Sequence, residues 1–256
     1  MKPILEINGV EKQFVGCRAL QGVDMTIRPG ETVGLLGPNA SGKTTLLKTI
    51  AGLLQPTAGT LSYTAAEQNN PAYAPPNATT ANQCAGGIEA RKIVSYCPDT
   101  MKFPKWMRVR DVFAFYADMY PDFIQARADE LMRTLELSPV ENSMVKNLSK
   151  GMQERLALAV TFSREASLYL LDEPLDGIDP VGKTRVIDAF ISMQPEGAST
   201  LISTHMVKDI ERVLTSVHFL SRGKIIFTGE CDAMREERSQ TVEQTYLEVF
   251  YNEAAY

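Results

Sequence analysis

The amino-acid sequence has few cysteines, no excess of basic residues and no long apolar run. Its four cysteines lie at spacings that fit neither a C-x-x-C pair nor a zinc site, so we expect free thiols in a reducing cytosol. Lysine and arginine number 26 and aspartate and glutamate 31, a balance that argues against a general binder of nucleic acids. No segment approaches the roughly 18 apolar residues that a membrane-spanning helix requires. The hydrophobic content of 44% excludes wholesale disorder and is ordinary for a globular protein.

Two segments differ from the rest of the chain in composition. Residues 62–90 contain eight alanines, four asparagines and three prolines but no lysine or arginine, which predicts a surface loop or a partly disordered insertion. Residues 230–256 hold seven acidic and two basic side chains, so their net charge of −5 equals that of the whole chain. Apolar residues recur there at helical spacing, as at Val242, Tyr246 and Phe250, and we expect a terminal amphipathic helix.

Strand-like and helix-like patterns alternate along the remainder of the chain. Strands are expected at Ile4–Ile7, Val23–Ile27, Thr32–Leu36, Ile93–Cys97, Leu168–Leu171 and Thr200–Ser203. Helices are expected at Lys43–Leu54, Val109–Tyr120 and Phe123–Leu137, and from Ser149, Pro180 and Met206. Alternation of this kind predicts an α/β fold with a mainly parallel sheet and with ligands at the carboxyl ends of its strands.

One loop between a predicted strand and a predicted helix carries a phosphate-binding pattern. Gly37 to Thr44 reads G-P-N-A-S-G-K-T, which fits G-x-x-x-x-G-K-[ST]. Gly37 and Gly42 leave backbone N–H groups open to phosphate oxygens, and the following helix adds its positive N-terminal end. Lys43 is placed to reach the β- and γ-phosphates, and the Thr44 hydroxyl to bind Mg²⁺. We expect a nucleotide to be bound by Gly37, Pro38, Asn39, Ala40, Ser41, Gly42, Lys43, Thr44 and Thr45.

A second motif delivers two carboxylates at the end of an apolar strand. The strand Leu168–Leu171 is followed directly by Asp172 and Glu173. With a phosphate loop in the same chain, Asp172 is placed to hold Mg²⁺, and Glu173 to activate the attacking water as a general base. The alternative is a pair that only caps the junction between the strand and its loop, which the phosphate loop disfavours.

Three further motifs resemble those of the ABC ATPases. Leu148-Ser-Lys-Gly-Met-Gln-Glu-Arg155 resembles the signature motif of that family, usually written L-S-G-G-Q. The segment from Pro174 to Pro180, P-L-D-G-I-D-P, is similar to the family's D-loop, and His205 matches its switch histidine. The motifs follow the family order, and the resemblance extends from about Leu5 to Gly229.

The resemblance implies the architecture of the whole chain. It predicts a P-loop NTPase core with a mainly parallel sheet, an N-terminal antiparallel β part and an inserted helical subdomain. The core would comprise residues 1–98 and 148–229, the helical subdomain 99–147, and the acidic extension 230–256.

The resemblance also implies roles for residues outside the phosphate loop. His205 would hydrogen-bond the γ-phosphate and hold the attacking water, which makes it catalytic together with Glu173 and Lys43. Ser149 and Gly151 would cap the γ-phosphate bound to the opposite subunit of a head-to-tail dimer, although Ser149 also suits a helix N-cap and both roles can hold.

Two other positions are assigned to the nucleotide on the same basis. Asp179, in the D-loop, is assigned to the nucleotide site. Phe14 aligns with the family's aromatic residue that stacks on adenine, with packing at a sheet edge as the alternative.

Some positions depart from the family pattern. Lys150 and Met152 replace the usual Gly and Gln of the signature, and Asp99 stands where the family has Gln after the strand that precedes the helical subdomain. A carboxylate still suits Mg²⁺, so Asp99 is a further candidate metal ligand beside Thr44 and Asp172, unless it only caps the following turn.

The implied function is an ATP-binding and ATP-hydrolysing subunit that powers transport through a separate membrane permease by ATP-driven dimerisation, with ATP and Mg²⁺ as its ligands. The dimer would pair two identical or two different subunits. The segment Met101–Met107 and the helices after it would receive a cytoplasmic helix of the permease, or would only pack the subdomain. The chain would be cytoplasmic, attached through the permease to the inner face of the cell membrane.

The alternative function is a soluble ABC-type ATPase that acts on a ribosome or on DNA. Such relatives typically carry two ATPase domains in one chain or long coiled-coil arms. The single set of motifs, the lack of heptads and the lack of a basic excess disfavour it, and no nucleic-acid partner is expected.

Overall fold

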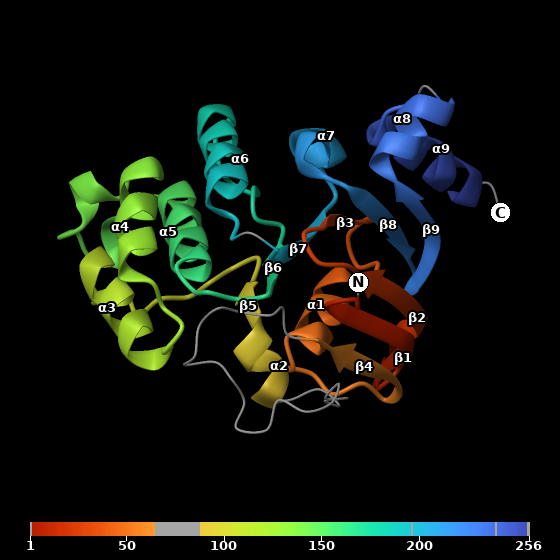
Figure 1. The fold of residues 1–256 in the computed structure, drawn as a ribbon, viewed down its shortest axis with the longest axis horizontal. Coiled ribbons are helices and arrows are strands. Elements are labelled where there is room, and N and C mark those ends of the chain that lie inside the picture. The colour runs from red at the N-terminus through yellow and green to blue at the C-terminus, as the bar shows by residue number, and fades with distance from the viewer. Residues whose placement is uncertain (1, 65–87, 196, 239, 255–256) are drawn as a thin grey trace.

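A six-stranded sheet runs through the computed structural model (Figure 1). Its strands are β3 (Thr32–Leu36), β5 (Val94–Cys97), β6 (Leu168–Asp172), β7 (Ser199–Thr204), β8 (Ser216–Ser221) and β9 (Lys224–Glu230). They lie in the order β5-β6-β7-β3-β8-β9; the β8–β9 pair is antiparallel and the other pairs are parallel. β3, β6 and β7 are buried at every position. Burial on both faces accounts for the nearly continuous apolar sequences of β3 and β6, whereas β7 (S-T-L-I-S-T) places four buried serines and threonines around Leu201 and Ile202. The structure describes residues 2–64, 88–195, 197–238 and 240–254.

A smaller antiparallel sheet and one helix cover one face of the large sheet. The small sheet contains β1 (Leu5–Phe14), β2 (Cys17–Ile27) and β4 (Ala58–Tyr63), in the order β2-β1-β4. The helix is α1 (Lys43–Ile50), whose Leu46 and Leu47 are fully buried in one cluster with Leu168 and Leu170 of β6. The expected N-terminal antiparallel part and mainly parallel sheet are both confirmed.

Helices cover the opposite face of the large sheet. They are α5 (Lys150–Phe162), α6 (Pro180–Met193), α7 (Val207–Ile210), α8 (Cys231–Arg238) and α9 (Val242–Ala254). A short turn, η4 (Glu211–Val213), follows α7 directly. Strand residues Leu171 and Phe219 join Phe162 of α5 and Phe190 of α6 in a second buried cluster. Phe219 also meets the ring of Tyr246 edge-on at 5.4 Å, so α9 packs on the sheet.

Two further helices and two short turns form a lobe at one end of the molecule (Figure 1). The lobe contains α3 (Val109–Met119), α4 (Gln125–Thr134) and the short turns η2 (Ser138–Val140) and η3 (Val145–Asn147). α5 packs against α3 and α4 as well as against β5, and it thereby joins the lobe to the sheet. The expected division of the chain into a core and a helical subdomain at residues 98 and 148 stays a prediction.

A buried ion pair fastens the lobe to the sheet just beyond the end of α5. The guanidinium of Arg164 donates to both carboxylate oxygens of Asp122, with a shortest distance of 2.9 Å. It also donates to the Val94 carbonyl oxygen at 3.2 Å and lies 4.0 Å from the centre of the Tyr120 ring. The Arg164 side chain is 6% exposed and that of Asp122 is fully buried, so breaking this pair would leave a charge buried without a partner.

Two helices are shorter than their apolar spacing predicts. The helix expected at Lys43–Leu54 ends at Ile50, because Gly52 turns the chain with a positive φ of 67°. The helix expected at Phe123–Leu137 occupies only the middle of that range as α4. Beyond its end Glu136 adopts a φ of 56°, which a right-handed helix excludes. Apolar spacing continued past both helix ends because the following turns are also partly buried.

The insertion expected at 62–90 is too wide at both ends. Ser62 and Tyr63 belong to β4, and a short helix, α2 (Ile88–Ile93), precedes β5. Most of the expected insertion, residues 65–87, lies outside the described residues, so the prediction of a loop there stays a prediction.

The acidic extension expected at 230–256 contains two helices, α8 and α9, where one was expected, and Glu230 still belongs to β9. Tyr246 and Phe250 of α9 contact each other, with ring centres 4.5 Å apart, and pack against the cluster that covers the sheet. Within the described ranges, no helix combines the length and the apolar character needed to cross a membrane.

Candidate active site

The phosphate-binding loop joins the carboxyl end of β3 to the N-terminus of α1, and its glycines are required by close backbone contacts. A Cβ on Gly37 would lie 2.2 Å from the Leu220 carbonyl oxygen, and one on Gly42 would lie 2.7 Å from the Ala19 carbonyl oxygen. The Ser41 hydroxyl is buried in this loop and has no hydrogen-bond partner among the described residues. A free buried hydroxyl and a bare backbone at a helix N-terminus fit an anion such as a triphosphate.

The Lys43 side chain lies within this loop and is 6% exposed. Its ammonium donates to the carbonyl oxygens of Gly37 at 2.7 Å and Pro38 at 3.2 Å. It also forms an ion pair with Glu173, with 3.3 Å between Nζ and Oε1. The positive charge is therefore directed into the loop and toward the carboxylates of the second motif.

Asp172 ends β6 beside this loop and is 1% exposed. Its carboxylate accepts a hydrogen bond from the Ser203 hydroxyl of β7 at 2.5 Å and another from the Thr44 hydroxyl. Burial raises the pKa of Asp172, and the neighbouring carboxylates of Asp99 and Glu173 raise it further, while the two hydroxyl donors oppose the shift. A bound cation at this position would relieve the repulsion between these carboxylates.

Glu173 follows Asp172 in a left-handed turn, with a φ of 48°. Its backbone N–H donates to the Ser203 carbonyl oxygen at 3.0 Å, and its side chain lies between two groups. One carboxylate oxygen faces Lys43. The other lies 3.0 Å from Nδ1 of the His205 ring and also accepts a hydrogen bond from the backbone N–H of His205 at 3.3 Å. Residues from the carboxyl ends of β3, β6 and β7 therefore meet at one place, which is where parallel α/β sheets bind their ligands.

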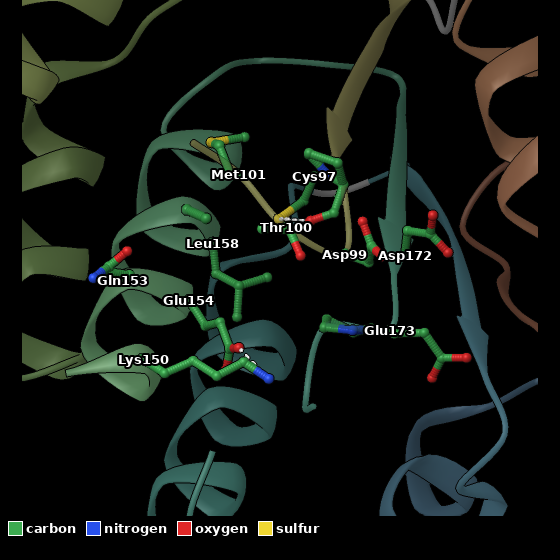
Figure 2. Close-up of a pocket in the computed structure, with 13 residues that line it drawn as sticks. Cys97, Asp99, Thr100, Met101, Lys150, Gln153, Glu154, Leu158, Asp172 and Glu173 are labelled. Atoms are coloured by element: carbon green, nitrogen blue, oxygen red, sulfur yellow. Dashed lines mark hydrogen bonds and ion pairs between the residues drawn. The ribbon is translucent and has the colours of Figure 1, made fainter. Parts of the chain in front are cut away.

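Asp99 lies beside this meeting point, in the segment between β5 and α3. Figure 2 shows its carboxylate next to that of Asp172, in a pocket that is walled on the other side by Lys150 and Glu154 of α5. Among the described residues, no group of three or more histidine, cysteine, aspartate or glutamate side chains is arranged to hold a metal ion. A Mg²⁺ ion here would need phosphate oxygens to complete its ligands, as is usual for phosphoryl transfer.

The residues of the signature and of the D-loop lie at the starts of two helices. Ser149 is the N-cap of α5 and accepts a hydrogen bond from the Met152 N–H at 3.2 Å. A Cβ added to Gly151 would lie 3.4 Å from the carbonyl oxygen of Gly177, so the start of α5 packs on the D-loop. Contact with a nucleotide on an opposite subunit stays a prediction for Ser149 and Gly151.

Asp179 is the N-cap of α6. Its carboxylate accepts hydrogen bonds from the N–H groups of Val181 at 3.1 Å and Gly182 at 3.0 Å, and these bonds lower its pKa. This capping role accounts for an aspartate at the position, and a part in nucleotide binding stays a prediction.

Phe14 lies at the end of β1, next to the turn that leads into β2. It is 43% exposed, and the Lys12 ammonium lies 5.1 Å from the centre of its ring. A ring with this exposure is available for stacking and is not a core residue of the sheet edge. Stacking on adenine stays a prediction.

Comparison with known proteins identifies the family. The model of the ABC transporter family matches residues 20–176, more than half of the chain. This chain belongs to the ABC transporter family. It is 28% identical to the uncharacterized ABC transporter ATP-binding protein YdbJ of Bacillus subtilis, over 99% of this chain and 77% of that protein. It is 27% identical to the daunorubicin resistance ATP-binding protein DrrA3 of Streptomyces coeruleorubidus, over 91% of this chain and 70% of that protein.

Solved structures confirm the ABC ATPase fold. A structure described as the ATP-binding subunit of an ABC transporter matches with a TM-score of 0.80 at 24% identity, over 96% of this chain and 99% of the other. A post-hydrolysis dimer of the ATP-binding cassette MJ0796, bound to ADP and phosphate, matches with a TM-score of 0.72 at 20% identity, over 88% and 98% of the two chains.

Two residues of this ABC ATPase site were not expected from the sequence. Ser203 bonds to the Asp172 carboxylate, and the Tyr96 hydroxyl donates to the same carboxylate at 3.4 Å. Burial, together with the charges of Asp172 and Asp99, raises the pKa of Tyr96 well above its ordinary range. A polar residue near the end of a buried strand is a signal for Ser203, whereas Tyr96 resembles any aromatic residue of a strand.

A second pocket, of about 220 Å³, lies on the side of the ABC ATPase fold where the helical lobe meets the sheet. Tyr96, Tyr116 and Tyr120 line it together with Leu53 and Arg164. Tyr96 thus forms part of the wall of this pocket while its hydroxyl reaches Asp172. Leu53, which lines this pocket, is 49% exposed, and Phe115, whose ring centre lies 6.1 Å from that of Tyr116, is 51% exposed.

Proposed function

We propose that this chain is the ATP-binding and ATP-hydrolysing subunit of an ABC transporter, and that it powers transport through a separate membrane permease. The observation that carries the proposal is the meeting of Lys43, Glu173 and His205 at the carboxyl ends of three parallel strands, beside the phosphate-binding loop. Family membership supports ATP as the nucleotide. The chain would work at the cytoplasmic face of the cell membrane, held there by the permease.

The phosphate-binding loop would hold the triphosphate mainly through its backbone. The backbone N–H groups of Gly37 and of residues 39–45, and the buried Ser41 hydroxyl, would donate to phosphate oxygens; Pro38 has no N–H. The Lys43 ammonium would exchange its carbonyl and carboxylate contacts for the β- and γ-phosphates. The exposed ring of Phe14 would stack on adenine.

Thr44 and Asp172 would hold Mg²⁺, with Asp99 as a further ligand from the loop after β5. The ion would neutralise negative charge on the β- and γ-phosphates. Two hydrogen-bonded partners, Ser203 and Tyr96, fix the Asp172 carboxylate so that it is already oriented when the metal arrives.

Glu173 would take a proton from the attacking water. His205, 3.0 Å from the Glu173 carboxylate, would orient that carboxylate and donate to the γ-phosphate. ATP would also bring two subunits together head to tail, with Ser149, Gly151 and Asp179 of each reaching the site of the other. Closing and reopening of this dimer would drive the permease.

The permease would dock at the second pocket. Its wall of tyrosines and the exposed Leu53 suit the apolar face of a cytoplasmic helix. The link from Tyr96 to Asp172 would carry the effect of docking into the nucleotide site.

The ATPase activity is tested with the purified chain and Mg²⁺–ATP, by measuring phosphate release. We expect turnover that Lys43→Met abolishes, since the loop would lose its only side-chain cation aimed at the phosphates within the described residues. Binding of ATP without any hydrolysis, in the presence or absence of membranes, would contradict the proposed enzyme.

Transport coupling is tested by fractionating cells that express the chain. We expect it in the membrane fraction, and we expect Leu53→Glu to release it, because a carboxylate would be placed in the docking pocket. Leu247→Glu is the matched control, since Leu247 is an exposed leucine on α9, at the other end of the molecule (Figure 1). Recovery of the wild-type chain with ribosomes or DNA would favour the soluble alternative.

A further inference from the structure

The signature segment of this chain carries a lysine where the family motif has glycine, and the structure shows what this lysine contacts. Lys150 is the first residue of α5, directly after the N-cap Ser149. Its ammonium donates to the Asp176 carboxylate of the D-loop at 2.9 Å and lies 3.6 Å from the carboxylate of Glu154 (Figure 2 shows the second pair). Lys150 therefore links two motifs of the same subunit.

The D-loop is shaped to accept this side chain. Gly177 has a positive φ of 75°, and a Cβ at that position would lie 2.7–2.9 Å from the last three atoms of the Lys150 side chain. The backbone of the same turn meets α5 again at Gly151, whose added Cβ would lie 3.4 Å from the Gly177 carbonyl oxygen. The start of α5 and the D-loop are thus in contact at two successive residues, Lys150 and Gly151, and form one continuous surface.

The charges around Asp176 are consistent with this link. The Lys150 hydrogen bond lowers the pKa of Asp176, and the positive charges of Lys150 and Lys183 lower it further. Asp176 is therefore an ionised acceptor that lies between the signature helix and the region of the switch histidine.

We propose that Lys150 is a positioning residue that fastens the signature helix to the D-loop, so that both present themselves to a second ATP-binding subunit as one unit. This inference rests on the proposed function, because the two segments would face a partner only in the ATP-bound dimer. A glycine at this position has no side chain and cannot make the link.

The link should matter in the dimer and not for folding. In the single subunit the Lys150 and Asp176 side chains are 65% and 57% exposed, and ion pairs with that exposure contribute little to stability. Closure of a partner over the pair would remove water from it, and the attraction between the two charges would increase as the effective dielectric constant falls.

The test is a double-mutant cycle with Lys150→Met and Asp176→Asn, measured by steady-state ATP hydrolysis. Methionine keeps the length of the stem and suits a helix, and asparagine keeps the shape of aspartate. We expect each single variant to lower kcat by roughly three- to tenfold, and the double variant to be no worse than either one. KM for ATP should stay within about twofold, because neither residue belongs to the phosphate-binding loop.

Two further variants separate a positioning role from a loss of charge or of folding. Lys150→Arg should restore at least half of the activity, and Arg133→Met, which removes an exposed positive charge from α4, should leave activity unchanged. Thermal midpoints of all variants should match the wild type.

The outcomes that overturn the inference are distinct from a failure of the proposed function. If the wild type hydrolyses no ATP, the proposed function fails first. If the wild type and Asp176→Asn both hydrolyse ATP normally but Lys150→Met does not, Lys150 acts on a group other than Asp176, such as a phosphate of the partner's nucleotide. Additive losses in the double variant, or wild-type activity of both single variants, would equally overturn the link.

Discussion

Replacement of Glu173 by Gln tests the centre of the site, because its carboxylate lies between Lys43 and His205, the two side chains proposed to contact the γ-phosphate. Its oxygens are 3.3 Å from the Lys43 ammonium and 3.0 Å from Nδ1 of His205. At an effective dielectric constant near 20, two opposite charges at the first of these distances attract each other by about 5 kcal/mol. Desolvation of the 18% exposed Glu173 and the 6% exposed Lys43 offsets most of this attraction. We therefore expect Glu173→Gln to lower the unfolding free energy of the ligand-free protein by about 1–3 kcal/mol.

The same change should have the opposite effect on ATP binding. Loss of the carboxylate frees the Lys43 ammonium for phosphate and removes a negative charge beside the γ-phosphate. We expect ATP affinity to rise by about tenfold, equivalent to about 1.4 kcal/mol. Hydrolysis should slow by roughly 10²–10⁴-fold, the usual contribution of a general base, so that an ATP-bound dimer accumulates.

The assays are phosphate release, equilibrium binding of a fluorescent ATP analogue, light scattering for the dimer, and thermal unfolding without ligand. Glu130→Gln, at an exposed carboxylate of α4, is the control for loss of one negative charge. Normal turnover in Glu173→Gln would remove Glu173 from the role of base. Weaker ATP binding would show that its contact with Lys43 does not compete with phosphate.

Three other predictions follow from single contacts. Asp99→Asn should raise ATP affinity without Mg²⁺ and so reduce the ratio of metal-bound to metal-free affinity; an unchanged ratio would place Asp99 outside the site. Burial lowers the pKa of His218 to about 4 from 6.5, so the native state binds fewer protons than the unfolded chain between these values. Stability should thus be complete above pH 6.5 and fall by up to about 3 kcal/mol as the pH drops toward 4; His218→Gln should flatten that profile in chemical denaturation. Asp122→Asn should cost about 3–5 kcal/mol of unfolding free energy by leaving Arg164 buried without its partner, and a loss below 1 kcal/mol would contradict this.

The parts of the fold that the sequence predicts best are those with one dominant physical cause. β3 and β6 are buried on both faces, so their apolar runs are nearly unbroken. The positions of β3, β6 and β7 were all predicted to within a residue or two. Helix ends were predicted less well, because a single residue such as Gly52 or Glu136 in a left-handed conformation ends a helix while the apolar spacing continues.

The candidate site divides along similar lines. The phosphate-binding loop is local in sequence, so spacing alone locates it. The contact between Lys43 and Glu173 depends on strand order, and the bond from Ser203 to Asp172 depends on register, because these two residues are direct partners in the β6–β7 pairing. A short sequence motif specifies neither the order of the strands in the sheet nor the register in which they pair. The link from Lys150 to Asp176 likewise needs the packing of α5 on the D-loop.

The Arg164–Asp122 pair anchors the chain just beyond the carboxyl end of α5. It lies at the carboxyl end of the helix, and Ser149 lies at the other end, about 20 Å away for 13 residues. With Arg164 and Asp122 held in place, a rotation of α5 by roughly 10° about this end would displace Ser149 by about 3 Å, enough to make or break a hydrogen bond. Tyr120 and Arg164 line the second pocket, so a molecule bound there would act close to the anchored end of α5. A rotation of α5 started by a molecule bound in that pocket would therefore displace Ser149 more than it displaces the residues near Arg164.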